Sequence, residues 1–149
     1  MAGNATPQFT QNGNIGTPQN VTAANTSSEG GGTIATDIFK IFTADATNGS
    51  FVEYVRFIPT ATAPTTTTAT VGRLFISTVQ AGATTNANTH LIAEIVLPAV
   101  AADNAASAVN WIDIPLNFRI PAGNTLLVTN HAAPAANSVW KAIPFGGDY

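Results

Sequence analysis

The chain has 149 residues and a formal net charge of −3, and only 9% of its residues are charged, against about 25% in an average globular protein. Its five basic residues are scattered singly and form no phosphate-tracking stripe, so the composition argues against a nucleic-acid partner. The absence of cysteine excludes disulfides and thiolate sites. No apolar run approaches the roughly 18 residues of a membrane span.

The first 16 residues consist mainly of Gln, Asn, Gly, Thr and Pro. Only Phe9 and Ile15 offer large apolar side chains that could contact a partner. Such a segment cannot bury enough surface to offset the entropy lost on ordering. We therefore predict a flexible N-terminal arm over residues 1–16 and a single domain over residues 17–149. The arm is either a disordered tail or a segment that orders on a neighbouring molecule.

Short apolar segments separated by Gly, Pro, Asn and Thr fill the rest of the chain, and none predicts a helix of ten residues. Residues 99–108 are rich in alanine and form either a short helix or a loop. About eight strands with turns between them predict an all-β antiparallel sandwich, jelly-roll-like in its arrangement. The expected strands are 17–26, 33–43, 50–59, 71–79, 90–97, two within 109–130, and 138–145.

Two turns stand out. Asn48-Gly49 is a strong hairpin signal. In the segment from Trp111 to Asn130, Pro121 and Gly123 supply the backbone angles of a turn that folds the chain back on itself. The side chains expected in the core are Phe57, Leu74, Ile76, Ile95, Trp111, Leu126 and Trp140.

His90 and His131 each stand at the end of an apolar strand. A metal site would need at least a third ligand, and the sequence shows neither His-x-His nor His-x-x-x-His spacing. No serine lies in a Gly-x-Ser-x-Gly elbow. These observations predict no metal ligand, no cofactor-binding residue and no nucleophile.

Glu53, Glu94 and Asp113 fall inside expected strands. A glycosidase needs two carboxylates at a set separation, and the sequence shows no clear aromatic cluster that would line a sugar cleft. We predict instead that these acids form ion pairs across strands. Their expected partners are Arg56, Arg73, Arg119 and Lys141. The chain is therefore expected not to be an enzyme.

Four sequence features occur in a characteristic order: Val71-Gly72-Arg73-Leu74-Phe75-Ile76, His90-Leu91-Ile92-Ala93-Glu94-Ile95, Ile120-Pro121-Ala122-Gly123-Asn124-Thr125-Leu126, and the terminal Gly146-Gly147-Asp148-Tyr149 after Trp140 and Phe145. With them, residues 17–149 resemble small structural proteins of tailed bacteriophages and prophages.

The resemblance implies a capsid decoration (cement) protein, made in the cytoplasm of the bacterial host and bound to the capsid surface of the virion. Its expected partners are the major capsid protein and further copies of itself, as a homotrimer, with no nucleic acid and no membrane. The low charge fits an assembled protein. The alternatives are a tail, fibre or neck-associated adhesion module and, less favoured, a hydrolase or small-ligand binder.

Overall fold

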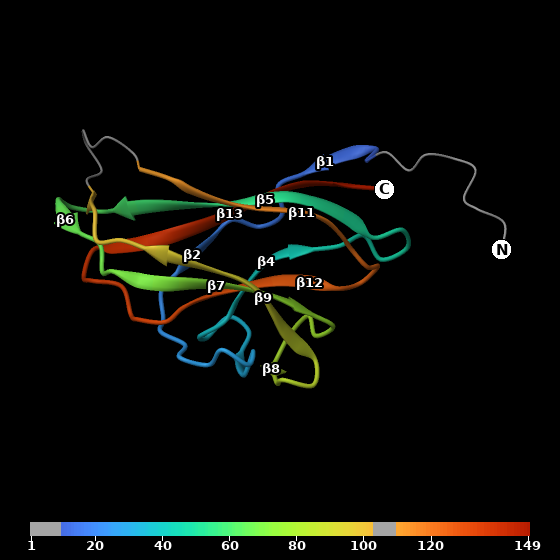
Figure 1. Ribbon diagram of the computed structural model, residues 1–149, viewed down its shortest axis with the longest axis horizontal. Helices are drawn as coiled ribbons and strands as arrows, with labels where there is room; N and C mark the ends of the chain where they lie inside the picture. The colour runs from blue at the N-terminus through green and yellow to red at the C-terminus, as the bar shows by residue number, and fades with distance from the viewer. Residues whose placement is uncertain (1–9, 103–109) are drawn as a thin grey trace, which may run out of the picture.

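The computed structural model describes residues 10–102 and 110–149 of the chain. All regular secondary structure in this part is β-strand, and the two principal sheets pack face to face as an antiparallel sandwich (Figure 1). This confirms the predicted fold class.

The first sheet has the strand order β1-β13-β5-β11, with β2 also paired to β13. Two short strands share one edge of β13: β2 lies along Trp140–Ala142 and β1 along Gly146–Asp148. The strands are β1 (Asn12–Asn14), β2 (Gln19–Val21), β5 (Ser50–Ala61), β11 (Ile112–Ile120) and β13 (Ser138–Asp148).

The second sheet has the order β4-β12-β7-β9. Its strands are β4 (Phe39–Thr43), β7 (Thr70–Ser77), β9 (Thr89–Leu97) and β12 (Thr125–Asn130). Two small ribbons accompany the sandwich, one of β3 (Gly32–Thr33) with β8 (Ala83–Thr84) and one of β6 (Thr65–Thr66) with β10 (Ala101–Ala102).

Both predicted turns exist, but neither joins neighbouring strands of one sheet. Gly49, with φ of 76°, lies between β4 in the second sheet and β5 in the first. Gly123, with φ of 74°, lies between β11 in the first sheet and β12 in the second. The hairpin predicted at Asn48-Gly49 is therefore wrong, because turn chemistry specifies a change of direction and not the strand that is paired afterwards.

The core lies between the two sheets. Phe57, Leu74, Leu126 and Trp140 are buried there, as predicted. Ile76 and Ile95 are partly buried and pack against this core. Trp111 is wrongly predicted, because 55% of its surface is exposed. It immediately precedes β11, where Ile112 and Ile114 pack in the core, so strand alternation turns the indole outward.

The outer face of the second sheet is covered by the segment that carries β3. Ile38, Phe75 and Leu127 form a second buried cluster beneath it, with Ile34 packed alongside. Figure 1 shows the loops with β3 and β8 on this side of the sandwich. No segment within residues 10–102 or 110–149 covers the outer face of the first sheet in the same way. Within the described part of the chain, the first sheet therefore has an outer face that no other segment covers.

Part of the segment predicted as an arm belongs to the domain. The strand β1 falls inside residues 1–16, and the Asn14 side-chain amide donates to both carboxylate oxygens of Asp148, at 3.1 and 2.9 Å. The Thr17 amide donates to the Ile41 carbonyl at 2.7 Å. The sequence-based boundary at residue 16 therefore divides a segment that is already paired with the sandwich.

The terminal Gly-Gly-Asp motif has a structural role. A Cβ at Gly146 would overlap the carbonyl oxygen of Phe51, and a Cβ at Gly147 would lie 2.8 Å from the carbonyl oxygen of Asn12. The two glycines let β5 and β1 approach β13 from opposite sides. Asp148 then joins the three strands, since it accepts hydrogen bonds from Ser50 on β5 and from Asn14 on β1.

Candidate functional site

The outer face of the first sheet is built by strand alternation on β5. Val55, Phe57 and Pro59 are buried, so the residues between them point away from the core. These outward residues are Tyr54, Arg56, Ile58 and Thr60, which lie opposite Phe145, Ile143, Lys141 and Val139 of β13. All eight side chains are partly exposed, and half of them are large and apolar or aromatic.

Five residues on this face, Tyr54, Arg56, Trp111, Asp113 and Phe145, form what we call the Arg56 cluster. The rings of Tyr54 and Phe145 stack with centroids 4.5 Å apart and an interplanar angle of 16°. The Arg56 guanidinium carbon lies 5.1 Å from the centre of the Trp111 ring. It lies 5.5 and 5.7 Å from the Tyr54 and Phe145 rings. These distances are within the range of cation–π attraction.

Asp113 fixes the plane of the arginine. Arg56 Nε and Nη2 donate to the two Asp113 carboxylate oxygens at 2.7 and 2.8 Å. This two-point ion pair has the geometry that suits guanidinium and carboxylate groups best. The hydrogen bond from Arg56 lowers the pKa of the Asp113 carboxyl below its ordinary value, and the same bond raises the pKa of Arg56. The cluster is therefore rigid and charge-balanced, with an exposed indole at its side.

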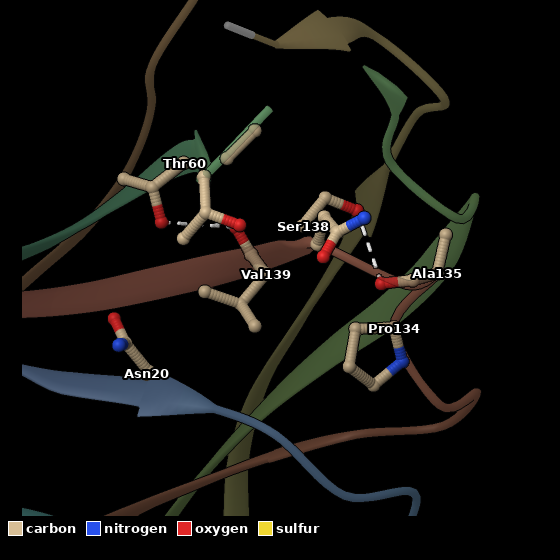
Figure 2. A pocket seen from close by; sticks show the side chains of 9 residues that line it. Asn20, Thr60, Pro134, Ala135, Ser138 and Val139 are labelled. Carbon is tan, nitrogen blue, oxygen red and sulfur yellow. Dashed lines mark hydrogen bonds between the residues drawn. The ribbon is translucent and has the colours of Figure 1, made fainter. Parts of the chain in front are cut away.

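A hollow lies further along the same face, beside Thr60, and we call it the Thr60 hollow. Its volume is about 330 Å³. Figure 2 shows Thr60 and Val139 on one side of it, Asn20 below, and Pro134, Ala135 and Ser138 on the other. Its walls come from β2, β5, β13 and the segment that precedes β13.

The predicted ion pairs form for two of the three acids. Asp113 binds Arg56, and Glu94 Oε1 accepts from Arg73 Nε at 2.6 Å. Glu53 makes no ion pair with any described residue. Because Glu94 lies on β9 in the second sheet, it does not share a face with Asp113.

Arg119 and the two histidines, which the sequence analysis singled out, have the following positions and contacts in the structure. Arg119 lies 5.0 Å over the Tyr149 ring and donates to the Asn48 carbonyl. His90 and His131 are exposed, and His131 Nδ1 lies 3.3 Å from Arg73 Nη1. Residues 10–102 and 110–149 contain no group of three or more His, Cys, Asp or Glu side chains that could hold a metal ion.

The structure describes one of the two predicted contact residues, Ile15. Ile15 is 57% exposed on the domain surface. Phe9 lies outside the described residues, as do residues 103–109, which contain most of the segment left open between helix and loop. The described part of that segment includes Ala101–Ala102, which forms β10.

Sequence reasoning predicted an ion pair for Asp113 without choosing Arg56 among the four basic residues, and it missed the aromatic rings around the pair. The signal was the spacing of Tyr54 and Arg56, which places both on one face of β5. The contributions of β11 and β13 depend on strand pairing, which no local pattern specifies. The sequence analysis expected no aromatic cluster near the acidic residues of the strands, and at Asp113 this expectation is wrong.

Comparison with known proteins does not assign the chain to a group: no family model, curated protein or solved structure matches it. In the part of the chain that the structure describes, no helix is long and apolar enough to cross a membrane.

Proposed function

We propose that the protein is a virion structural component without catalytic function, namely a capsid decoration protein on the outside of a bacteriophage head. The observation that carries the proposal is the free outer face of the first sheet, with its partly exposed apolar and aromatic side chains. Aromatic residues and arginine supply most of the binding energy in protein interfaces. This face is therefore suited to the major capsid protein, which would be the principal partner.

The order of the strands supports a jelly-roll-like arrangement. With β2 taken as the neighbour of β13 in place of β1, eight strands form the orders β2-β13-β5-β11 and β4-β12-β7-β9. Among their connections, the one from β7 to β9 stays in one sheet, and each of the others passes to the opposite sheet. Two interlocked Greek keys produce such an arrangement.

The open edge of the second sheet supports self-association. The strand β9 pairs only with β7 among the described strands, and it exposes Leu91, Ile92 and Val96, the last at 72%. An unpaired edge with exposed apolar side chains is prone to contact another chain. A homotrimer with closed symmetry would cover this edge in each subunit.

The N-terminal segment supplies a further contact in this proposal. Phe9 and Ile15 would bind a neighbouring subunit or the shell, as two apolar anchors in a polar stretch. Several weak arms in one oligomer would act together through their effective concentration. Replacing both residues with alanine is then expected to lower occupancy on particles without changing the stability of the isolated domain.

The decisive experiment is the copy number of the protein in purified virus particles, measured by quantitative mass spectrometry against the major capsid protein. A decoration protein is expected in hundreds of copies, and Trp111→Ala with Tyr54→Ala should lower its occupancy on the shell. Absence from particles, or a copy number unrelated to the capsid lattice, would contradict the proposal.

A second candidate is a tail, fibre or neck-associated adhesion module. The observation in its favour is the Arg56 cluster, because an exposed tryptophan beside stacked rings suits attachment to a surface. The same measurement separates the two candidates, since a tail component is expected in only a few to some tens of copies. Either location corresponds to a protein made in the host cytoplasm and carried in the virion.

A further inference from the structure

We propose that the Thr60 hollow and the exposed ring of Trp111 together form a binding site for a neutral carbohydrate. The inference deepens the second candidate function by naming its ligand. It rests on that second candidate, because a decoration protein would cover the outer face of the first sheet with the capsid shell, whereas an adhesion module leaves this face open to a ligand.

The chemistry of the Thr60 hollow defines the class of ligand. None of the described residues that line it is ionisable, so within residues 10–102 and 110–149 the hollow has no group that would compensate a buried charge on the ligand. Hydroxyl and amide side chains alternate with methyl and ring groups around its walls. A pyranose matches this mixture, because it carries hydroxyl groups at its edge and C–H groups on its faces. The polar lining residues are Asn20, Thr60, Thr62, Asn137 and Ser138, and the apolar ones are Ala61, Pro134, Ala135 and Val139.

Two side-chain amides are available to a ligand. Asn20 and Asn137 are both exposed, and neither side chain has a hydrogen-bond partner among the described residues. Each amide offers two donors and one acceptor oxygen. Neighbouring hydroxyl groups of a sugar both donate and accept, so an amide can bind a pair of them at once.

The hollow is formed before any ligand arrives. The Thr62 amide donates to the Asn137 carbonyl at 2.9 Å, and the Ser138 amide donates to the Ala135 carbonyl at 3.2 Å. The Ser138 hydroxyl donates to the same Ala135 oxygen at 3.4 Å, the contact drawn on the right of Figure 2. A preformed wall avoids the ordering cost that weakens binding. The volume of about 330 Å³ is at the lower end of small-molecule sites.

Trp111 lies close enough to extend this site. Ile112 is opposite Phe57, so Trp111 comes beside Ile58, two residues from Thr60 along β5. Two residues of a strand span about 7 Å. The Arg56 guanidinium carbon lies 5.1 Å from the centre of the indole ring, and 55% of the Trp111 surface remains exposed. Trp111 lies on the opposite side of β5 from β13 and β2, which line the hollow, so the indole is offset sideways as well as along the strand. A chain of several linked sugar rings is therefore needed to occupy the Thr60 hollow and contact the indole together.

The test is saturation-transfer NMR and calorimetry on the purified protein with a set of neutral hexasaccharides: maltohexaose, cellohexaose, mannohexaose and chitohexaose. Polygalacturonate serves as the charged comparison. At least one neutral probe is expected to bind with a dissociation constant near or below about 1 mM. Loss of aromatic stacking in Trp111→Ala should weaken it about two- to tenfold.

Asn137→Gly is a second variant that preserves folding, because glycine accepts the positive φ of 64° at this position. It should weaken binding of the same probe, as should Asn20→Ala, whereas Val96→Ala on the opposite sheet should not. Failure of all four neutral probes to bind, binding of the charged probe alone, or unchanged affinity in all three site variants would overturn the inference. Particle copy number is measured separately, so failure here leaves the proposed virion location standing.

Discussion

The two tryptophans should respond to substitution in opposite ways. Trp140 is 1% exposed, and its indole nitrogen has no hydrogen-bond partner in the described structure, so the ring acts as core volume. Trp140→Ala removes a buried aromatic ring and should lower the free energy of unfolding by about 3–5 kcal/mol. Trp111 is largely exposed and contacts Arg56. Trp111→Ala should cost only about 1 kcal/mol, the size of an exposed cation–π contact.

Urea denaturation measures this difference directly. With a slope of about 2 kcal/mol per molar, Trp140→Ala should lower the unfolding midpoint by about 2 M and Trp111→Ala by about 0.5 M. Small domains have only about 5–15 kcal/mol of stability, so the first variant should be marginally folded. Equal shifts for the two variants would refute the assignment of the two faces of the first sheet.

Fluorescence of conservative variants provides a control that does not depend on unfolding. In Trp140→Phe the remaining emission comes from Trp111, which should be red-shifted and quenched by acrylamide. In Trp111→Phe the remaining emission comes from Trp140, which should be blue-shifted and protected. Trp140→Phe also removes the unpaired donor, so it should cost less than Trp140→Ala. The reverse pattern of emission would place Trp111 in the core.

Three further outcomes are expected. Because the pKa of Asp113 is lowered in the folded protein, its ion pair contributes fully to stability above the ordinary carboxyl pKa, and this contribution is lost as the pH falls from there through the lowered pKa of the folded state. Acid titration of Asp113→Asn should therefore show a smaller loss of stability than the wild type. Gly146→Ala should destabilise the domain, since the new Cβ overlaps the Phe51 carbonyl, and a midpoint equal to wild type would contradict that reason. Deletion of residues 2–9 should leave the melting temperature nearly unchanged, whereas deletion of residues 2–16 should lower it by removing β1 from β13. Equal melting temperatures for the two deletions would show that β1 adds no stability.

Local sequence patterns predicted the elements of this fold better than their partners. Turn residues and the alternation of apolar and polar side chains located the long strands and placed Phe57 and Trp140 in the core. Strand position and side-chain orientation could be predicted because they depend on near neighbours in the chain. The turns at Gly49 and Gly123 were both located, but the one at Gly49 was misread as a hairpin, since one sequence signal serves a hairpin and a crossing between sheets. The short strand β1 has no apolar side chain and carried no signal at all.

The candidate site was predicted only in part for the same reason. Opposite charges on expected strands predicted an ion pair between Asp113 and one of four basic residues, and in the structure the partner is Arg56. The aromatic rings around this pair come from β5, from β13 and from the residue before β11, and the pairing of these strands is long-range. Trp111 was assigned to the core on its size alone, although an outward position at a strand entrance is compatible with the same sequence. The terminal Gly-Gly-Asp motif supported a family resemblance, and in the structure its residues explain the packing of three strands.

The position of β13 has a consequence for how the chain folds. This strand is the last of the described strands in chain order, yet it stands between β5 and the pair formed by β1 and β2. Its Asp148 meets Ser50 and Asn14 across 98 and 134 residues of sequence. Closing such large loops is slow. All four strands of the second sheet precede β13 in the sequence, so during synthesis this sheet can assemble before β13 is available. Until β13 arrives, β5 has an unpaired apolar edge, and β1 and β2 have no sheet to join, so this interval is when aggregation competes with folding.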